Sequence, residues 1–239
     1  MNPTSEIGEN LLRVQERINQ AAQATGRTLD QVRLIVVTKG HPIEIVEAAI
    51  AAGAEDLGEN YVEEALPKIN HFLAGDNLQW HMVGHVQSRK AKDVSAHFNW
   101  VQSVDSIKLA RRLDRFAVQF NRKLPILLEC NVSGEETKFG WTAWNELEWE
   151  ALGDELVPLL ELENLIPRGL MTMAPYFDQA EAVRPFFRRL RKLRDFLAAQ
   201  FPQHEWEELS MGMSGDFEVA IQEGATMVRI GTAILGARR

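Results

Sequence analysis

A lysine that directly follows an apolar run is the residue best placed for covalent chemistry. Residues 34–37 read Leu-Ile-Val-Val, and Thr38, Lys39, Gly40 and His41 come next. A run rich in β-branched residues and closed by glycine is typical of a strand buried on both faces of a parallel sheet. Lys39 would stand at the carboxyl end of this strand, where an amine shielded from water can act as a nucleophile. A solvated lysine just past a strand is the plainer alternative.

Two segments near the C-terminus, rich in glycine and hydroxyl groups, indicate an anion site. Residues 210–216 read Ser-Met-Gly-Met-Ser-Gly-Asp, and Gly231 and Thr232 follow the last apolar run. Each segment falls where a strand should pass into a helix, so free backbone N–H groups and the helix dipole would favour a phosphate. Either segment alone is also explained by turn and cap residues. The two together favour the phosphate.

Apolar runs alternate with helical patterns at intervals of about 25 residues. The runs that we expect to form strands span residues 32–39, 56–61, 79–84, 98–104, 125–132, 167–173, 208–212 and 226–230. Such alternation predicts parallel strands joined by crossover helices, and eight strands in 239 residues predict a closed (β/α)8 TIM-type barrel. An additional amphipathic helix over residues 5–24 precedes it. A doubly wound open sheet is the alternative fold, and without a linker or repeat we expect one domain over residues 1–239.

A barrel would bring the lysine and the anion site together, because the carboxyl ends of all its strands meet at one face. The loops after the seventh and eighth strands, which carry the two glycine-rich segments, are where barrels often bind phosphate. An amine beside a phosphate site suits a phosphorylated aldehyde, which forms a Schiff base with the amine while the phosphate anchors it. Pyridoxal 5'-phosphate (PLP) is the leading candidate, and a phosphosugar aldehyde is the alternative.

Segments spread in order over nearly the whole chain resemble the pyridoxal phosphate homeostasis protein family. They are VVTKGH at 36–41, LGENYVEEA at 57–65, WHMVGHVQSRK at 80–90, NVSGEETKFG at 131–140, GLMTMAP at 169–175, LSMGMSGDFEVAI at 209–221 and VRIGTAILGAR at 228–238. His85 and Val86 depart from the family pattern. The resemblance implies a PLP-binding barrel of fold type III, similar to the N-terminal domain of alanine racemase.

The resemblance also implies roles for particular residues. Lys39 would hold PLP as a Schiff base, Asn60 and His81 would flank the ring, and Arg229 would face the pyridine nitrogen. The phosphate would be held by Ser214, Gly231 and Thr232, with Ser210, Met211 and Gly212 lining the same end. Because a guanidinium is permanently charged, Arg229 would disfavour protonation of the ring nitrogen and make the ring a poorer electron sink. Chemistry of the transaminase kind is therefore disfavoured.

Two functions follow from this reading. The resemblance implies a protein of intracellular PLP homeostasis that holds the cofactor without strong turnover, with apo PLP-dependent enzymes as candidate recipients. The alternative is a small PLP-dependent amino-acid racemase. Racemisation needs an acid and a base on opposite faces of the substrate, and in the similar racemases an additional domain supplies the second group. The sequence ends shortly after the eighth strand. We therefore expect a carrier rather than an enzyme.

The composition of the chain limits the classes of binding partner and the cellular compartment that we expect. A net charge of −8 argues against nucleic-acid binding, which needs a basic face. No apolar stretch reaches the roughly 20 residues that span a bilayer, and the N-terminus lacks the pattern of a signal peptide. We expect a cytoplasmic monomer with no membrane partner and no metal site. Cys130 should be a core residue, and the charges of a basic helix over residues 178–200 should form a solvated face.

Overall fold

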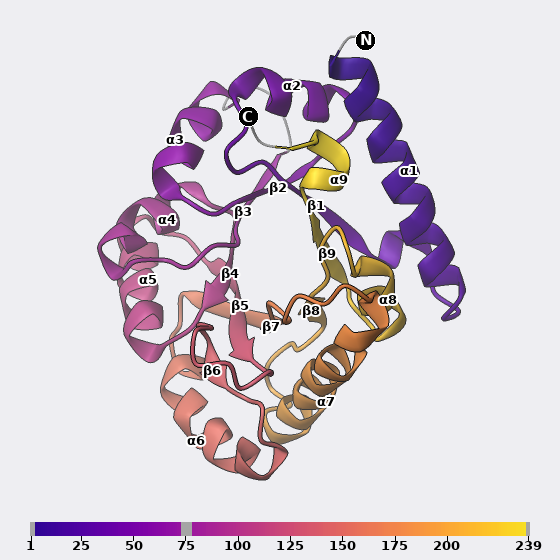
Figure 1. The fold of residues 1–239 in the computed structure, drawn as a ribbon. Helices are drawn as coiled ribbons and strands as arrows, with labels where there is room; N and C mark the ends of the chain where they lie inside the picture. The colour runs from indigo at the N-terminus through magenta and orange to yellow at the C-terminus, as the bar shows by residue number, and fades with distance from the viewer. Residues whose placement is uncertain (1–2, 73–77, 238–239) are drawn as a thin grey trace.

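The computed structural model describes residues 3–72 and 78–237, and within them eight parallel strands close into a barrel (Figure 1). The strands of the barrel are β1 (Arg33–Val37), β2 (Asp56–Glu59), β3 (Gln79–Met82), β4 (Trp100–Val104), β5 (Leu124–Asn131), β7 (Leu165–Met171), β8 (Glu208–Ser210) and β9 (Met227–Ile230). Hydrogen bonds run in the order β4-β3-β2-β1-β9-β8-β7-β5, and a pairing between β4 and β5 closes the ring. The predicted barrel is confirmed, and the open sheet is wrong.

Helices surround the barrel in the order that the sequence predicts. They are α1 (Pro3–Gln23), α2 (Ile43–Ala51), α3 (Val62–His71), α4 (Ala91–His97), α5 (Ile107–Gln119), α6 (Trp149–Leu160), α7 (Arg184–Gln200), α8 (Phe217–Gln222) and α9 (Thr232–Leu235). Short 3₁₀ helices are η1 (Leu29–Gln31), η2 (Ser88–Lys90), η3 (Glu146–Glu148) and η4 (Ala180–Val183). The leading helix α1 packs against α2, α8 and α9. It therefore covers the part of the barrel where the first and last strands pair.

The apolar core has two parts because alternate residues of each barrel strand face opposite ways. One large cluster fills the space between the strands and the helices, and it includes Cys130, as predicted. A smaller cluster from five strands consists of Ile35, Trp100, Leu127, Met171 and Met227. These side chains occupy the barrel interior, so the barrel is packed rather than hollow along its length.

A ninth short strand departs from the sequence prediction. β6 (Trp141–Thr142) pairs in parallel with the end of β5, whereas none of the eight predicted strands includes these two residues. The Trp141 indole Nε1–H donates to the carbonyl oxygen of Val104 at 3.0 Å, so that a buried aromatic side chain ties this segment to the barrel. The helix α6 begins only at Trp149. A two-residue strand is too short to show a periodic pattern.

The arginines of α7 do more than cover a solvated face. Arg184 and Arg188 donate to the carboxylate of Glu223, and Arg191 lies 3.6 Å from it. The Glu223 side chain is only 4% exposed. Burial raises the pKa of Glu223, but the hydrogen bonds from Arg188 and Arg184 and the charges of the arginines together outweigh burial and leave the pKa below its ordinary value. The side chains of Arg188 and Arg191 are 53% and 38% exposed, in line with the predicted solvated face, but together with Arg184 they also fasten α7 to the end of α8, which the prediction did not include.

No helix within residues 3–72 and 78–237 combines the length and the apolar composition needed to cross a membrane.

Candidate cofactor site

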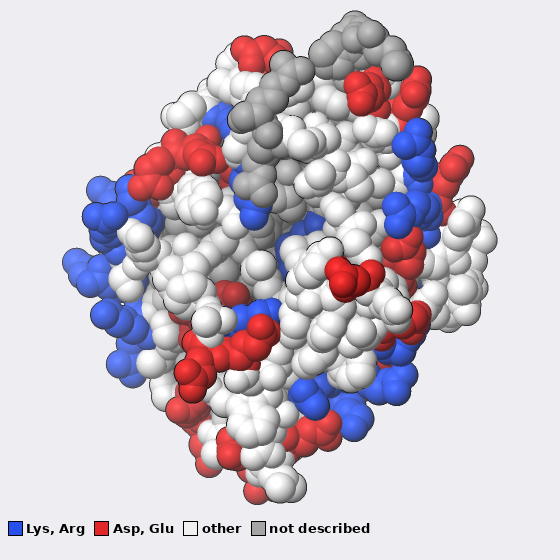
Figure 2. All heavy atoms as spheres, viewed as in Figure 1, with Lys and Arg blue, Asp and Glu red and all other residues white. Residues whose placement is uncertain are grey.

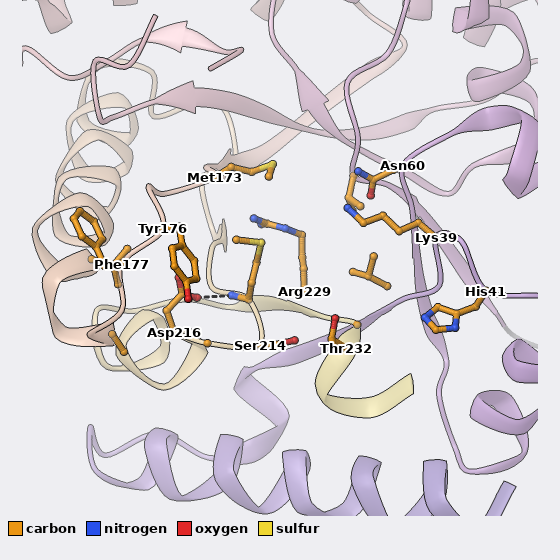
Figure 3. Close-up of a pocket in the computed structure, with 17 residues that line it drawn as sticks. Lys39, His41, Asn60, Met173, Tyr176, Phe177, Ser214, Asp216, Arg229 and Thr232 are labelled. Carbon is orange, nitrogen blue, oxygen red and sulfur yellow. Dashed lines mark hydrogen bonds between the residues drawn. The ribbon is translucent and has the colours of Figure 1, made fainter. Parts of the chain in front are cut away.

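A cavity of about 310 Å³ opens at the carboxyl ends of the barrel strands. Figure 2 shows a hollow over the barrel axis, with atoms of basic side chains inside it. The cavity is lined by residues at the ends of β1 and β9 and by the segments that follow β1, β2, β3, β7, β8 and β9. Part of the predicted set of site residues lines it, namely Lys39, Asn60, Ser214, Arg229, Gly231 and Thr232 (Figure 3). Residues almost 200 positions apart in sequence thus line the same cavity, as the barrel prediction requires.

The turn that carries Lys39 is held by α3. Lys68 reaches in from α3, and its Nζ donates to the Thr38 carbonyl oxygen at 2.8 Å and to the Glu59 carboxylate at 2.6 Å. The Thr38 hydroxyl donates to the same Glu59 oxygen at 2.6 Å, and the Gly40 N–H donates to Glu64 at 2.8 Å. Glu59 is fully buried, and burial raises the pKa of its carboxyl despite the hydrogen bonds from Lys68 and Thr38. A buried ion pair therefore fixes the backbone next to Lys39, whose side chain extends toward Asn60.

The two glycine-rich segments lie against each other at the other side of the cavity. Asp216 caps the first loop by accepting the Met213 N–H at 2.6 Å (Figure 3). The Ser214 hydroxyl oxygen accepts the Ala233 N–H at 3.4 Å, which joins this loop to the start of α9. A Cβ on Gly231 would meet the Val37 carbonyl oxygen at 3.0 Å. Glycine therefore lets the second loop approach the end of β1 closely.

Arg229 lies at the base of the cavity, with 5% of its surface exposed. Its Nη1–H donates to the Ser210 hydroxyl at 2.6 Å and its Nη2–H to the Thr172 carbonyl oxygen at 2.8 Å. Burial lowers the pKa of Arg229 to about 10, although Glu129 and Asp216 oppose this. The guanidinium stays protonated at neutral pH, so the cavity contains a fixed cation in addition to the Lys39 amine.

A buried carboxyl group accompanies this arginine. Glu129 is 6% exposed, and its Oε2 has no hydrogen-bond partner among the described residues. Burial and, to a smaller extent, the charge of Asp105 raise the pKa of Glu129 to about 7, with the charge of Arg229 acting in the opposite direction. Glu129 therefore changes its protonation state close to neutral pH.

The remaining predicted residues, His81, Ser210, Met211 and Gly212, do not line the cavity. His81, Ser210 and Met211 are fully buried, and Gly212 has a φ of +95°, which a larger residue would adopt only with strain. The imidazole of His81 lies parallel to Trp100 at 5.8 Å inside the barrel. Ser210 reaches the cavity only through its hydrogen bond to Arg229.

An apolar wall completes the cavity, and the sequence reasoning missed it. It is formed by Met173, Tyr176, Phe177, Ala180, Val183 and Met213. Several of these side chains are exposed, Tyr176 to 89% and Met173 to 42%. Most of the wall comes from the segment between β7 and α7, which has neither strand nor α-helical periodicity. The available signal was its apolar content immediately after a strand end.

Within residues 3–72 and 78–237, no cluster of three or more His, Cys, Asp or Glu side chains is arranged to hold a metal ion.

Comparison with known sequences identifies the family. Residues 10–239 match the family described as "Alanine racemase, N-terminal domain". The "Pyridoxal phosphate homeostasis protein" of Vibrio alginolyticus is 40% identical over 238 residues, with 98% of each chain covered. The protein of the same name from Pseudomonas aeruginosa is 43% identical over 234 residues, with 98% of this chain and 96% of the other covered. The chain belongs to the pyridoxal phosphate homeostasis protein family. The resemblance predicted from the sequence segments is thereby confirmed.

Solved structures agree with this family and its fold. PipY of Synechococcus elongatus, in a structure described as having PLP bound, is 36% identical in sequence to this chain, and the two structures superpose with a TM-score of 0.83. The match covers 96% of this chain and 100% of PipY. An alanine racemase of Clostridium difficile is 15% identical with a TM-score of 0.68, and the match covers 56% of that chain. At this identity the racemase shows a shared barrel fold only.

Proposed function

We propose that this protein binds PLP and serves in PLP homeostasis, with Lys39 as the residue that attaches the cofactor covalently. The observation that carries the proposal is the convergence of the Lys39 amine, the Arg229 guanidinium and the hydroxyls of Ser214 and Thr232 on one cavity. Relatives at about 40% identity are named for PLP homeostasis, and the similar PipY structure is described as having PLP bound.

The residues of the cavity fit the cofactor. PLP supplies an aldehyde that condenses reversibly with a primary amine, and it carries a phosphate that can be held separately. Ser214, Gly231 and Thr232 come from two loops that contact each other, and they would hold the phosphate. Asn60 lies beside Lys39 and would position the ring. The volume of the cavity and its mixture of cations, hydroxyls and apolar walls suit a small aromatic phosphate ester.

Arg229 would set the electronic character of the bound ring. It remains cationic at neutral pH and would disfavour a proton on a pyridine nitrogen placed against it. This arrangement weakens the ring as an electron sink, which favours holding the cofactor over turning over amino acids. We therefore include in the proposal a carrier role without strong turnover, in the cytoplasm, with apo PLP-dependent enzymes as recipients.

The absorbance spectrum of the protein after incubation with PLP tests the proposal. Wild type should show the visible band of a lysine-bound cofactor, and Lys39→Ala should lose it. Lys92→Ala is the matched control, because Lys92 is exposed on α4 and lies outside the cavity. Borohydride reduction followed by peptide mapping should place the added mass on Lys39. An unchanged spectrum in Lys39→Ala would refute the assignment, and steady racemisation of either alanine enantiomer at enzyme-like rates would refute the carrier role.

A further inference from the structure

A chain of buried hydrogen bonds leads from Arg229 through the barrel interior to β2. The Arg229 Nη1–H donates to the Ser210 hydroxyl at 2.6 Å, and this hydroxyl donates to Gln102 Oε1 at 2.7 Å. Gln102 Nε2 lies 3.0 Å from His81 Nδ1, and His81 Nε2 lies 2.8 Å from the Asp56 carboxylate. Ser210, Gln102 and His81 have no exposed surface. Four consecutive contacts thus connect the base of the cavity to the amino-terminal end of β2.

The Asp56 carboxylate, at the end of the series away from the cavity, fixes the direction of every hydrogen bond in it. A carboxylate only accepts, so His81 Nε2 carries the proton that is donated to Asp56. Burial lowers the pKa of His81 and Asp56 only partly opposes this, so the imidazole is neutral and its Nδ1 accepts. Gln102 must then present its NH₂ group to His81 and its oxygen to Ser210. The Ser210 proton is consequently directed at Gln102.

This direction matters for Arg229 because a serine hydroxyl can rotate and serve as either donor or acceptor. With its proton committed to Gln102, Ser210 Oγ presents lone pairs to the guanidinium. Without Gln102, the hydroxyl proton could turn toward Arg229 and repel it. The carbonyl oxygen of Thr172 holds the second terminal nitrogen, so both Nη atoms have acceptors of fixed direction.

We propose that Gln102, His81 and Asp56 are positioning residues that fix the orientation of the Arg229 guanidinium at the cavity. None of the three lines the cavity, and the hydrogen bonds that link them lead through Ser210 to Arg229, which does. The role rests on the proposed function, because it matters to the cofactor only if Arg229 faces the PLP ring. This role also explains why a series of polar side chains lies in the barrel interior, where other buried side chains, such as Ile35, Leu127 and Met227, are apolar.

Nitrogen-15 NMR of the histidine side chains in the cofactor-free protein tests the hydrogen-bond direction. Wild type should show His81 with a protonated-type shift at Nε2 and an unprotonated-type shift at Nδ1 at neutral pH. In Gln102→Met the Nδ1 resonance should move, because its donor is lost. A His81 that is protonated at Nδ1, or at both nitrogens, would overturn the proposal without any need for PLP.

A double-mutant cycle on PLP affinity tests whether Gln102 acts through Arg229. Gln102→Met should raise the Kd for PLP roughly tenfold, the effect of about one hydrogen bond to a charged group. In an Arg229→Met background the same substitution should leave the Kd unchanged. Gln87→Met is the matched control, because Gln87 is exposed and lies outside the cavity, and it should leave the Kd unchanged in either background.

The outcomes of the cycle separate the positioning role from the proposed function. Equal losses of affinity from Gln102→Met in both backgrounds would mean a general structural effect and would overturn the positioning role alone. Wild type that takes up no PLP would overturn the proposed function and the positioning role together. Circular dichroism of each variant verifies folding, and the NMR measurement on wild type stands even if Arg229→Met does not fold.

Discussion

Replacing Lys68 with methionine tests whether the buried ion pair beneath the Lys39 turn stabilises the fold. Lys68 and Glu59 are 2.6 Å apart, and their side chains are 6% and 0% exposed. Methionine keeps most of the aliphatic length of the lysine but removes its charge and its donors. The Glu59 carboxylate would then lack its cation, and the Thr38 carbonyl oxygen would lose its Nζ–H donor. Glu59 Oε2 already has no partner among the described residues, so the carboxylate has little to replace Lys68.

The expected loss follows from how deeply the pair is buried. Removing one partner of a buried ion pair costs about 3–5 kcal/mol, because it leaves an uncompensated buried charge. For a chain of this size each kcal/mol shifts the Tm by about 2–4 °C, so we expect a drop of roughly 10 °C. Lys90→Met is the matched control: Lys90 and Glu63 form an ion pair whose side chains are 27% and 62% exposed. An exposed pair of this kind contributes about 0–1 kcal/mol.

Thermal unfolding followed by circular dichroism, with both variants in the same buffer, measures the difference. The loss of folding stability in Lys68→Met should also depend on pH. Burial raises the folded-state pKa of Glu59, and loss of the Lys68 hydrogen bond raises it further. A raised folded-state pKa contributes stability at low pH that is lost as the pH rises, so the loss of stability in Lys68→Met should grow as the pH rises above the ordinary pKa of a glutamate. A Tm for Lys68→Met within a degree or two of that for Lys90→Met would refute this reasoning.

Two further changes probe groups close to the cavity and in the barrel wall. Because burial raises the pKa of Glu129 to about 7, the folded state should lose stability as the pH rises toward about 8. Glu129→Gln should remove this decline, which is on the order of 3 kcal/mol, in Tm measured against pH; an unchanged slope would contradict it. Gly169→Ala should lower the Tm far more than Gly26→Ala, since both have positive φ but only at Gly169 would a Cβ overlap the Glu208 carbonyl oxygen. Equal effects of the two alanine substitutions would show that backbone strain alone decides the loss.

The order of elements was predictable because it rests on local patterns. The strand ending before Lys39 and the capped helix α5, where the Ser106 side chain accepts the Leu109 N–H, are both visible in short windows of sequence. β6 was not predictable, since two residues have no period and each of them pairs with a β5 residue eleven positions earlier. The contact that the arginines of α7 make with a buried carboxylate was missed for a similar reason. Their partner Glu223 is distant in sequence, and a helical pattern shows which face is charged but not what lies against it.

The sequence by itself determined the barrel, the amine at Lys39 and the glycine-rich loops at 210–216 and 231–232, because each is encoded by contiguous residues. Only the tertiary structure decided which predicted site residues reach the cavity. Along a strand, successive side chains alternate between the interior and the outer face, and the level of each in the barrel depends on register with its neighbours. Register therefore places Arg229 at the cavity and His81 beneath it, joined through Gln102 and Ser210. No pattern within either segment reveals that connection.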